Sequence, residues 1–126
     1  MRIAALDHLV LTVADIGATV AFYERLGMRA EKFAGGRVAL RFGDQKVNLH
    51  PAGAEFEPHA LRPVPGSADL CFLIDGSLAD VETLLAEAGV PIELGPVERE
   101  GAVGAMDSLY LRDPDGNLVE LSRSRS

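Results

Sequence analysis

Cysteine is nearly absent from this sequence of 126 residues, in which Cys71 stands alone. A single cysteine cannot form a disulfide within the chain and cannot supply the paired thiolates of a zinc finger. The sequence also lacks an apolar run of the ~18 residues that a transmembrane helix needs. Its apolar N-terminal segment is interrupted by Asp7 and His8 and is followed by no small-residue cleavage signal, so it is interpreted as a core strand and not as a signal peptide. These absences predict a cytoplasmic protein without a membrane partner.

Basic residues are also few. The chain has 12 Lys and Arg against 19 Asp and Glu, for a net charge of −7. Binding to nucleic acid or to an anionic membrane depends on clustered positive charge, so neither partner is expected. Hydrophobic residues make up 48% of the chain and charged residues 25%, as in globular proteins. The length suits one domain with a hydrophobic core. Neither the composition nor the charge excludes a small-molecule substrate.

Two helices and eight strands are predicted from the residue pattern. The first helix runs over 16–26 between a capping Asp15 and a terminating Gly27, and the second runs from a capping Ser77 to Ala88 before Gly89. The strand-like runs are 6–13, 29–33, 37–42, 46–50, 69–74, 91–94, 105–111 and 118–122.

The order of these elements repeats. HLVLTV at 8–13 lies over DLCFLI at 69–74, an offset of 61, and the helix caps and terminating glycines are offset by 62. A repeat of this length suits a duplicated half-domain. Residues 51–67 hold four of the seven prolines and predict an ordered linker. We therefore predict a single α+β domain over 1–126, with βαβββ modules at about 5–50 and 68–123.

Polar residues stand at matching positions in otherwise apolar strands. His8 and Asp69 open the first strand of each half, and Glu120 lies in the last strand of the second half. A shift of 70 places His50 over Glu120, and a shift of 72 places Asn48 there. A lone His or Glu in a strand is most often a surface residue, but imidazole and carboxylate together are the ligand set for Fe, Mn, Ni, Co or Zn. The repeat therefore favours a divalent metal site.

The chain resembles the vicinal oxygen chelate superfamily. The segments that carry the resemblance are LDHLVLTVAD at 6–15, FYERLGM at 22–28, SADLCF at 67–72 and LYLRDPDGNLVELS at 109–122. The superfamily includes glyoxalase I, fosfomycin-resistance proteins, extradiol dioxygenases and bleomycin-resistance proteins. The nearest likeness is to its single-domain, glyoxalase-like virulence proteins. The resemblance implies paired βαβββ modules that each form a half-open β cup, with metal ligands on the first and last strands of each module.

The resemblance also implies ligands at specific positions. His8 matches the first-strand His of the superfamily, and Glu120 matches the Glu of its last strand. Asp69 stands where the superfamily usually has His, and His50 or Asn48 stands where glyoxalase I has Glu. We favour His50 over Asp69 as the third ligand, because imidazole binds late transition metals more tightly. Asp69 then serves as a fourth ligand or supports the others.

Strand parity predicts which other side chains share the ligands' face, because alternate residues point to opposite sides of a sheet. Ser108 and Tyr110 alternate with Leu109 and Leu111, and Arg37 and Arg41 alternate with apolar residues in the same way. Arg41, Ser108 and Tyr110 are the candidate substrate contacts, as an Arg suits a carboxylate or phosphonate. The competing interpretation leaves both arginines as solvated charge. Cys71 shares this face as a small apolar residue.

The resemblance implies a metal-dependent lyase or isomerase of the glyoxalase type, acting on a small substrate whose neighbouring oxygens chelate the metal. Glu120 is the candidate catalytic base. The alternatives are oxygenation of a diol, opening of an epoxide, or metal-free binding of a small molecule as in bleomycin resistance. A homodimer is also implied.

Overall fold

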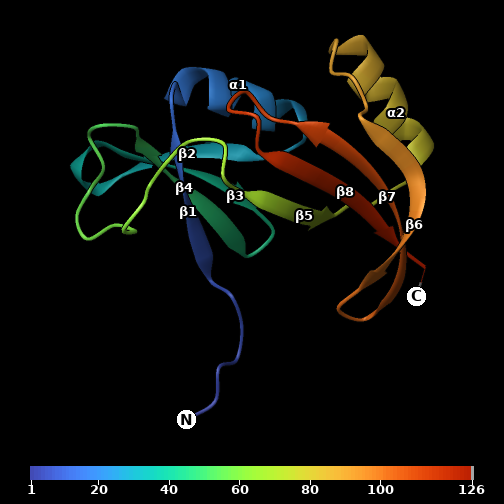
Figure 1. Cartoon of the computed structure of the whole chain (residues 1–126), viewed down its shortest axis with the longest axis horizontal. Coiled ribbons are helices and arrows are strands. Elements are labelled where there is room, and N and C mark those ends of the chain that lie inside the picture. Colours follow the sequence, from blue (N-terminus) through green and yellow to red (C-terminus); the bar gives the residue numbers. More distant parts are fainter. Residues whose placement is uncertain (126) are drawn as a thin grey trace. The chain divides into compact units, whose positions relative to one another are not determined.

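The computed structural model describes residues 1–125, and the chain divides into two compact units. Unit one is Met1–Ser67 and unit two is Ala68–Ser126. Figure 1 labels the elements. Unit one contains β1 (His8–Val13), α1 (Ile16–Arg25), β2 (Arg29–Phe33), a 3-10 turn (Ala34–Gly36), β3 (Arg37–Phe42) and β4 (Gln45–Pro51). Unit two contains β5 (Asp69–Leu73), α2 (Leu78–Glu87), β6 (Leu94–Gly101), β7 (Gly104–Arg112) and β8 (Leu118–Ser124).

Each unit is built on one open, four-stranded sheet. The strand order is β1-β4-β3-β2 in unit one and β5-β8-β7-β6 in unit two. In both sheets the first and last strands of the module pair in parallel, and the other pairs are antiparallel. The predicted α+β class and the repeated βαβββ order are confirmed. Neither sheet is closed, so each unit keeps one face of its sheet uncovered by its own helix (Figure 1).

The core of each unit lies between its sheet and its helix. In unit one, Val13, Leu40 and Leu49 are at most 1% exposed and share the sheet face on which Tyr23 of α1 packs. The alternate residues of these strands, among them His8 and His50, point to the opposite face, here called the open face. The predicted N-cap is confirmed, because the Asp15 carboxylate accepts from the Ala18 amide at 2.9 Å.

Unit two repeats this arrangement. Leu109, Leu111 and Val119 are completely buried on the side of α2, whose Leu85 is also completely buried. The Ser77 hydroxyl caps α2 by accepting from the Asp80 amide at 3.1 Å. The parity predicted for β7 is therefore confirmed, and Ser108 and Tyr110 lie on the open face.

The second strand of unit two differs from its prediction. A strand was expected over 91–94, but β6 runs over Leu94–Gly101 and pairs with β7. Its sequence, LGPVEREG, has little of the β-branched and aromatic content that marks a strand. The register shifts between Leu94 and Val97, where Gly95 has φ +113° and a Cβ would lie 2.4 Å from the Ser108 carbonyl oxygen. Glycine at this bulge lets β6 pass close to β7.

The DPDGN segment after β7 is a turn held by Asp113. The Asp113 carboxylate accepts from the amides of Asp115 at 2.9 Å and Asn117 at 3.0 Å, and from the Asn117 side-chain amide at 2.8 Å. The Asn117 side-chain oxygen accepts from the Ala68 amide at 2.9 Å, just before β5. The turn therefore ties β8 to the start of β5.

Residues 52–67 after β4 contain neither helix nor strand, as expected for the proline-rich linker. Among residues 1–125, neither helix is long and apolar enough to cross a membrane.

Candidate functional site

Glu120 lies on the open face of the sheet of unit two. In the strand register it is opposite Cys71 of β5 on one side and Tyr110 of β7 on the other. Directly opposed residues of neighbouring strands share a face and lie within contact range. Glu120 is half-buried, so its carboxylate is held by the sheet and still reaches solvent.

Two serines hold this carboxylate. The Ser108 hydroxyl donates to Glu120 Oε2 at 2.7 Å, and the Ser122 hydroxyl lies 3.2 Å from the same oxygen. The two hydroxyls are 2.7 Å apart, and both serines are completely buried. Both serines act on Oε2, and neither hydroxyl bonds to Oε1. The arrangement fixes the direction of the carboxylate and leaves one oxygen for a metal ion, a substrate or a proton.

A pocket of about 560 Å³ opens over Glu120 and is formed by residues of unit two alone. Tyr110 and Arg99 line it, and Arg99 Nε donates to the Tyr110 hydroxyl at 3.0 Å. The Arg99 guanidinium also lies 5.5 Å from the centre of the Tyr110 ring. The pocket therefore combines a carboxylate, a phenol and a cation, with Met106 and Val103 as apolar contacts.

Cys71 also lines this pocket, and its Sγ lies 3.3 Å from the Ser122 hydroxyl. Burial raises the pKa of the Cys71 thiol, and the negative charges of Glu120 and Asp69 add to the increase. The hydrogen bond with Ser122 acts in the opposite direction. Because the thiolate is the reactive form, the raised pKa disfavours Cys71, which is exposed, as a nucleophile.

His8 begins β1 on the open face of unit one. Its Nδ1 lies 2.7 Å from Asp7 Oδ2. A carboxylate can only accept, so Nδ1 carries the proton, and the free lone pair of the neutral imidazole is on Nε2. A carboxylate that orients a histidine in this way is common beside metal ligands. The side chain is 42% exposed, so Nε2 is accessible.

His50 is not beside His8 in the sheet. The parallel register pairs His8 with Lys46, Val10 with Asn48 and Thr12 with His50. The two histidines are thus four residues apart along the strands, or roughly 13 Å. The binding of one ion by both imidazoles, which the sequence favoured, does not follow from this register.

Asn48 is the counterpart of Glu120 by register. Asn48 pairs with Val10 just as Glu120 pairs with Cys71, and Val10 and Cys71 are both two residues beyond the openers of their strands. The shift of 72 therefore describes the repeat, and His50 corresponds to Ser122.

His50 is instead a buried histidine, only 6% exposed. Its ring packs edge-on against Phe56 with the ring centres 5.4 Å apart, and Nδ1 has no hydrogen-bond partner within residues 1–125. Burial lowers the pKa of His50 below its ordinary value of 6.5; the positive charges of Arg37 and His59 add to this, while Glu55 opposes it. The imidazole is therefore neutral at neutral pH.

This buried histidine predicts a loss of stability in mild acid. As pH falls below about 6.5, the unfolded chain binds a proton that folded His50 does not bind, so the free energy of unfolding decreases until the lower folded pKa is passed. The His50→Phe variant is expected to lose less stability than the wild type between about pH 7.5 and 5.5. Urea unfolding of the two proteins across this range is the measurement. Equal pH slopes for wild type and His50→Phe would contradict the prediction.

The remaining predicted site residues, Arg41 and Asp69, do not join a cluster of possible metal ligands among the described residues of their own units. Arg41 donates to the Glu31 carboxylate on the neighbouring strand, so its charge is already partly neutralised. Asp69 is exposed at the start of β5, where it pairs with Leu118. Within either unit, residues 1–125 hold no group of three His, Cys, Asp or Glu side chains close enough to bind an ion.

Three of the predicted site residues come together in unit two: Glu120, Ser108 and Tyr110. Ser108 is completely buried, so it orients Glu120 and does not contact a substrate. Sequence reasoning missed Ser122 and Arg99. Ser122 was detectable by parity, since it is two residues beyond Glu120. Arg99 was not, because its strand was not predicted.

The chain is similar to proteins of one family. The model of the Glyoxalase/Bleomycin resistance protein/Dioxygenase superfamily matches residues 5–121. The glyoxalase domain-containing protein RDO1 of Mycosarcoma maydis is 55% identical over 122 residues, which are 97% of this chain and 69% of that protein. Virulence protein STM3117 of Salmonella typhimurium is 55% identical over 124 residues, covering 98% of this chain and 86% of that protein. Its crystal structure superposes with a TM-score of 0.95 over 98% of both chains.

A more distant relative is the metallothiol transferase FosB of Shouchella clausii. It is 31% identical over 123 residues, which cover 92% of this chain and 77% of that protein.

Proposed function

Because the chain belongs to the Glyoxalase/Bleomycin resistance protein/Dioxygenase superfamily, we propose that it is a metal-dependent enzyme of the glyoxalase type. Its chemistry is that of a lyase or isomerase acting on a small molecule with two neighbouring oxygen atoms. The observation that carries this proposal is Glu120, a half-buried carboxylate that two buried serines hold in a pocket of about 560 Å³.

Glu120 is the proposed acid–base group. Its Oε2 is fixed by Ser108, and its free Oε1 takes a proton from the substrate and returns it to a neighbouring atom. The Tyr110 hydroxyl on the adjacent strand accepts from Arg99 and can donate its own proton to a substrate oxygen. Arg99 adds positive charge on the side of the pocket where negative charge develops in an enediolate.

The donor groups of each unit, taken separately, are of the kinds that bind a divalent metal ion. His8 presents Nε2 because Asp7 holds Nδ1, and Glu120 presents Oε1, which would serve in turn as a ligand and as the base. We propose these two residues as ligands with Asp69 as the third, since the register of β1 and β4 separates His50 from His8. Ni, Co, Mn, Fe and Zn all accept imidazole and carboxylate. When bound, such an ion polarises the substrate oxygens as a Lewis acid.

Metal content tests this assignment directly. Wild-type protein purified without chelators is expected to bind about one divalent ion per chain. His8→Ala removes a ligand and is expected to weaken binding by at least about 10–100-fold, the loss caused by removing a group that only supports a ligand. Elemental analysis after loading with each of the five metals is the measurement. His59→Ala, an exposed histidine held only by the Ala60 carbonyl, is the matched control. A wild-type chain that takes up none of the five metals would remove the basis of the metalloenzyme proposal.

A second candidate is the addition of a thiol to an epoxide. It is favoured by the likeness to a relative named as a metallothiol transferase. Assays with methylglyoxal plus thiols, with fosfomycin plus thiols and with catechols separate the two candidates and also test for dioxygenase activity. A metal-free binding protein of the bleomycin-resistance type would turn over none of these compounds.

We also propose a homodimer. Each unit leaves one face of a four-stranded sheet without a helix of its own, and oligomers with two-fold symmetry commonly bury such faces. Light scattering at micromolar concentration is expected to give twice the mass of the 13.4 kDa chain. A monomer under these conditions would contradict the proposal.

A further inference from the structure

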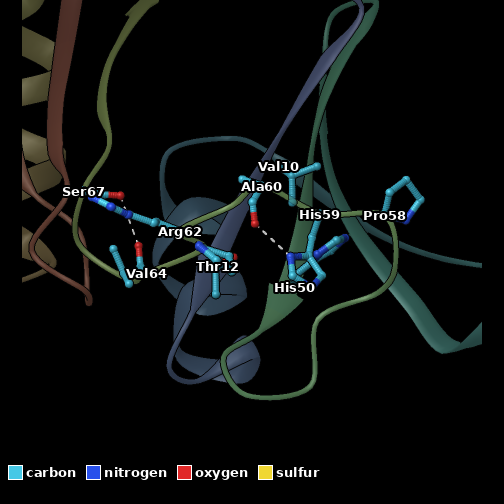
Figure 2. Close-up of a pocket in the computed structure, with 10 residues that line it drawn as sticks. Val10, Thr12, His50, Pro58, His59, Ala60, Arg62, Val64 and Ser67 are labelled. Carbon is cyan, nitrogen blue, oxygen red and sulfur yellow. Dashed lines mark hydrogen bonds between the residues drawn. The ribbon is translucent and has the colours of Figure 1, made fainter.

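Unit one has a second pocket, of about 540 Å³, formed entirely by its own residues. The sheet contributes the open face of β1 and β4 through Val10, Thr12 and His50. The proline-rich linker contributes the opposite side, between Pro58 and Ser67. Figure 2 shows His50 and His59 toward one end of the pocket and Arg62 and Ser67 toward the other. The volume is typical of a small-molecule site.

The pocket carries positive charge in an acidic protein. Its lining includes the guanidinium of Arg62 as its fixed positive charge, and none of the lining residues is Asp or Glu. The chain as a whole has a net charge of −7. A pocket that concentrates the sign opposite to the protein's net charge attracts an anion.

Several polar groups of this pocket have no protein partner. The Arg62 guanidinium makes no ion pair or hydrogen bond within residues 1–125, and neither does the Thr12 hydroxyl. His50 is 94% buried, and its Nδ1 is also without a partner over the same residues. Buried polar groups of folded proteins are nearly always hydrogen-bonded, so this unpartnered imidazole is an independent sign that a ligand belongs here.

The rest of the lining is apolar. Val10 and Val64 are 44% and 55% exposed, and Pro58 and Pro63 of the linker also line the pocket. Exposed apolar side chains on a pocket wall favour a ligand with an apolar body. A carboxylate matches the planar fork of an arginine in a bidentate contact, and an organic carboxylate also supplies the apolar body that this lining favours.

We propose that this pocket of unit one binds a small organic carboxylate, with its carboxyl group on Arg62 and its apolar body along Val10 and Val64. The Thr12 hydroxyl and the His50 imidazole serve a hydroxyl or carbonyl group of the ligand. The proposal goes beyond the enzyme function proposed above, because it needs neither a metal ion nor Glu120.

The test uses the full chain, stripped of metal with a chelator and labelled with ¹⁵N. The probe is 3-phenylpropanoate, and the matched neutral probe is 3-phenylpropanamide. For a ligand of this size we expect a Kd of about 1 mM. Amide shifts on titration should cluster at residues 10–12, 50 and 58–67. Arg62→Gln should weaken binding about tenfold or more, since a charge-assisted contact is lost. Arg2→Gln removes the same charge outside the pocket and should bind like the wild type.

Three results would overturn the proposal: no shifts in the pocket at about 10 mM probe, ten times the expected Kd; equal binding of the amide; or wild-type affinity in Arg62→Gln. Arg62 is exposed and makes no contact that the fold needs, so the variant is expected to fold. Because the protein is free of metal, a failure here leaves the enzyme proposal untouched, and binding here is no evidence for catalysis.

Discussion

Replacement of Glu120 by glutamine is expected to lower turnover of the enzyme's substrate by about 10²–10⁴-fold, the range for removal of a positioned acid–base group. Glutamine is nearly isosteric, so the packing of β8 should survive. Its amide cannot accept a proton as the carboxylate does, and it is a poorer ligand for a divalent ion. The Ser108 hydroxyl, 2.7 Å from Oε2, can still donate to the amide oxygen. The loss therefore reports on chemistry and not on position.

The measurement is kcat on the substrate that the assay panel identifies, beside a thermal unfolding curve for each variant. Glu87→Gln, at the exposed end of α2, is the control and should keep wild-type activity. Wild-type turnover in Glu120→Gln would show that Glu120 is neither the base nor an essential ligand. A metal-free binding protein behaves differently, since ligand affinity changes modestly and there is no reaction to lose.

The architecture could be predicted from the sequence because both halves follow the same rules. Helix caps at Asp15 and Ser77 and alternation in β7 mark their elements locally, and the structure confirms them. β6 escaped prediction because its pairing with β7 is decided by tertiary contact. Its sequence has Gly95 and Pro96 near one end and three consecutive charged residues at 98–100, and the register shifts at the bulge around Gly95. Arg99 lies on β6 and lines the pocket, so it was missed for the same reason.

The part of the candidate site that could be predicted is the part that depends only on which sheet face a side chain occupies. Glu120, Ser108 and Tyr110 share a face whatever the exact register of their strands. The choice between Asn48 and His50 was different, because both point to the same side and only the pairing of β1 with β4 distinguishes them. A slip of two residues keeps the face and moves a side chain by about 7 Å. That displacement decides whether two residues can bind one ion, and single-sequence patterns do not encode it.

The second large effect is expected on stability, at the turn that precedes β8. Asp113 is only 5% exposed, and its carboxylate accepts hydrogen bonds from two amides and from the Asn117 side chain. Asp113→Ala is expected to lower the free energy of unfolding by about 3 kcal/mol, because the variant leaves three donors unpaired in a buried turn. Asp113→Asn keeps the shape but offers only one acceptor oxygen, so we expect a smaller loss of about 1 kcal/mol.

Urea unfolding of the three proteins measures these differences. Asp44→Ala, in the exposed connection between β3 and β4, is the control and should stay within about 0.5 kcal/mol of the wild type. Asn117 holds the Ala68 amide at 2.9 Å, so release of the turn should also loosen the start of β5, and hydrogen exchange of the Ala68 amide should accelerate. If Asp113→Ala unfolds at the same urea concentration as Asp44→Ala, the turn does not stabilise the strand that carries Glu120.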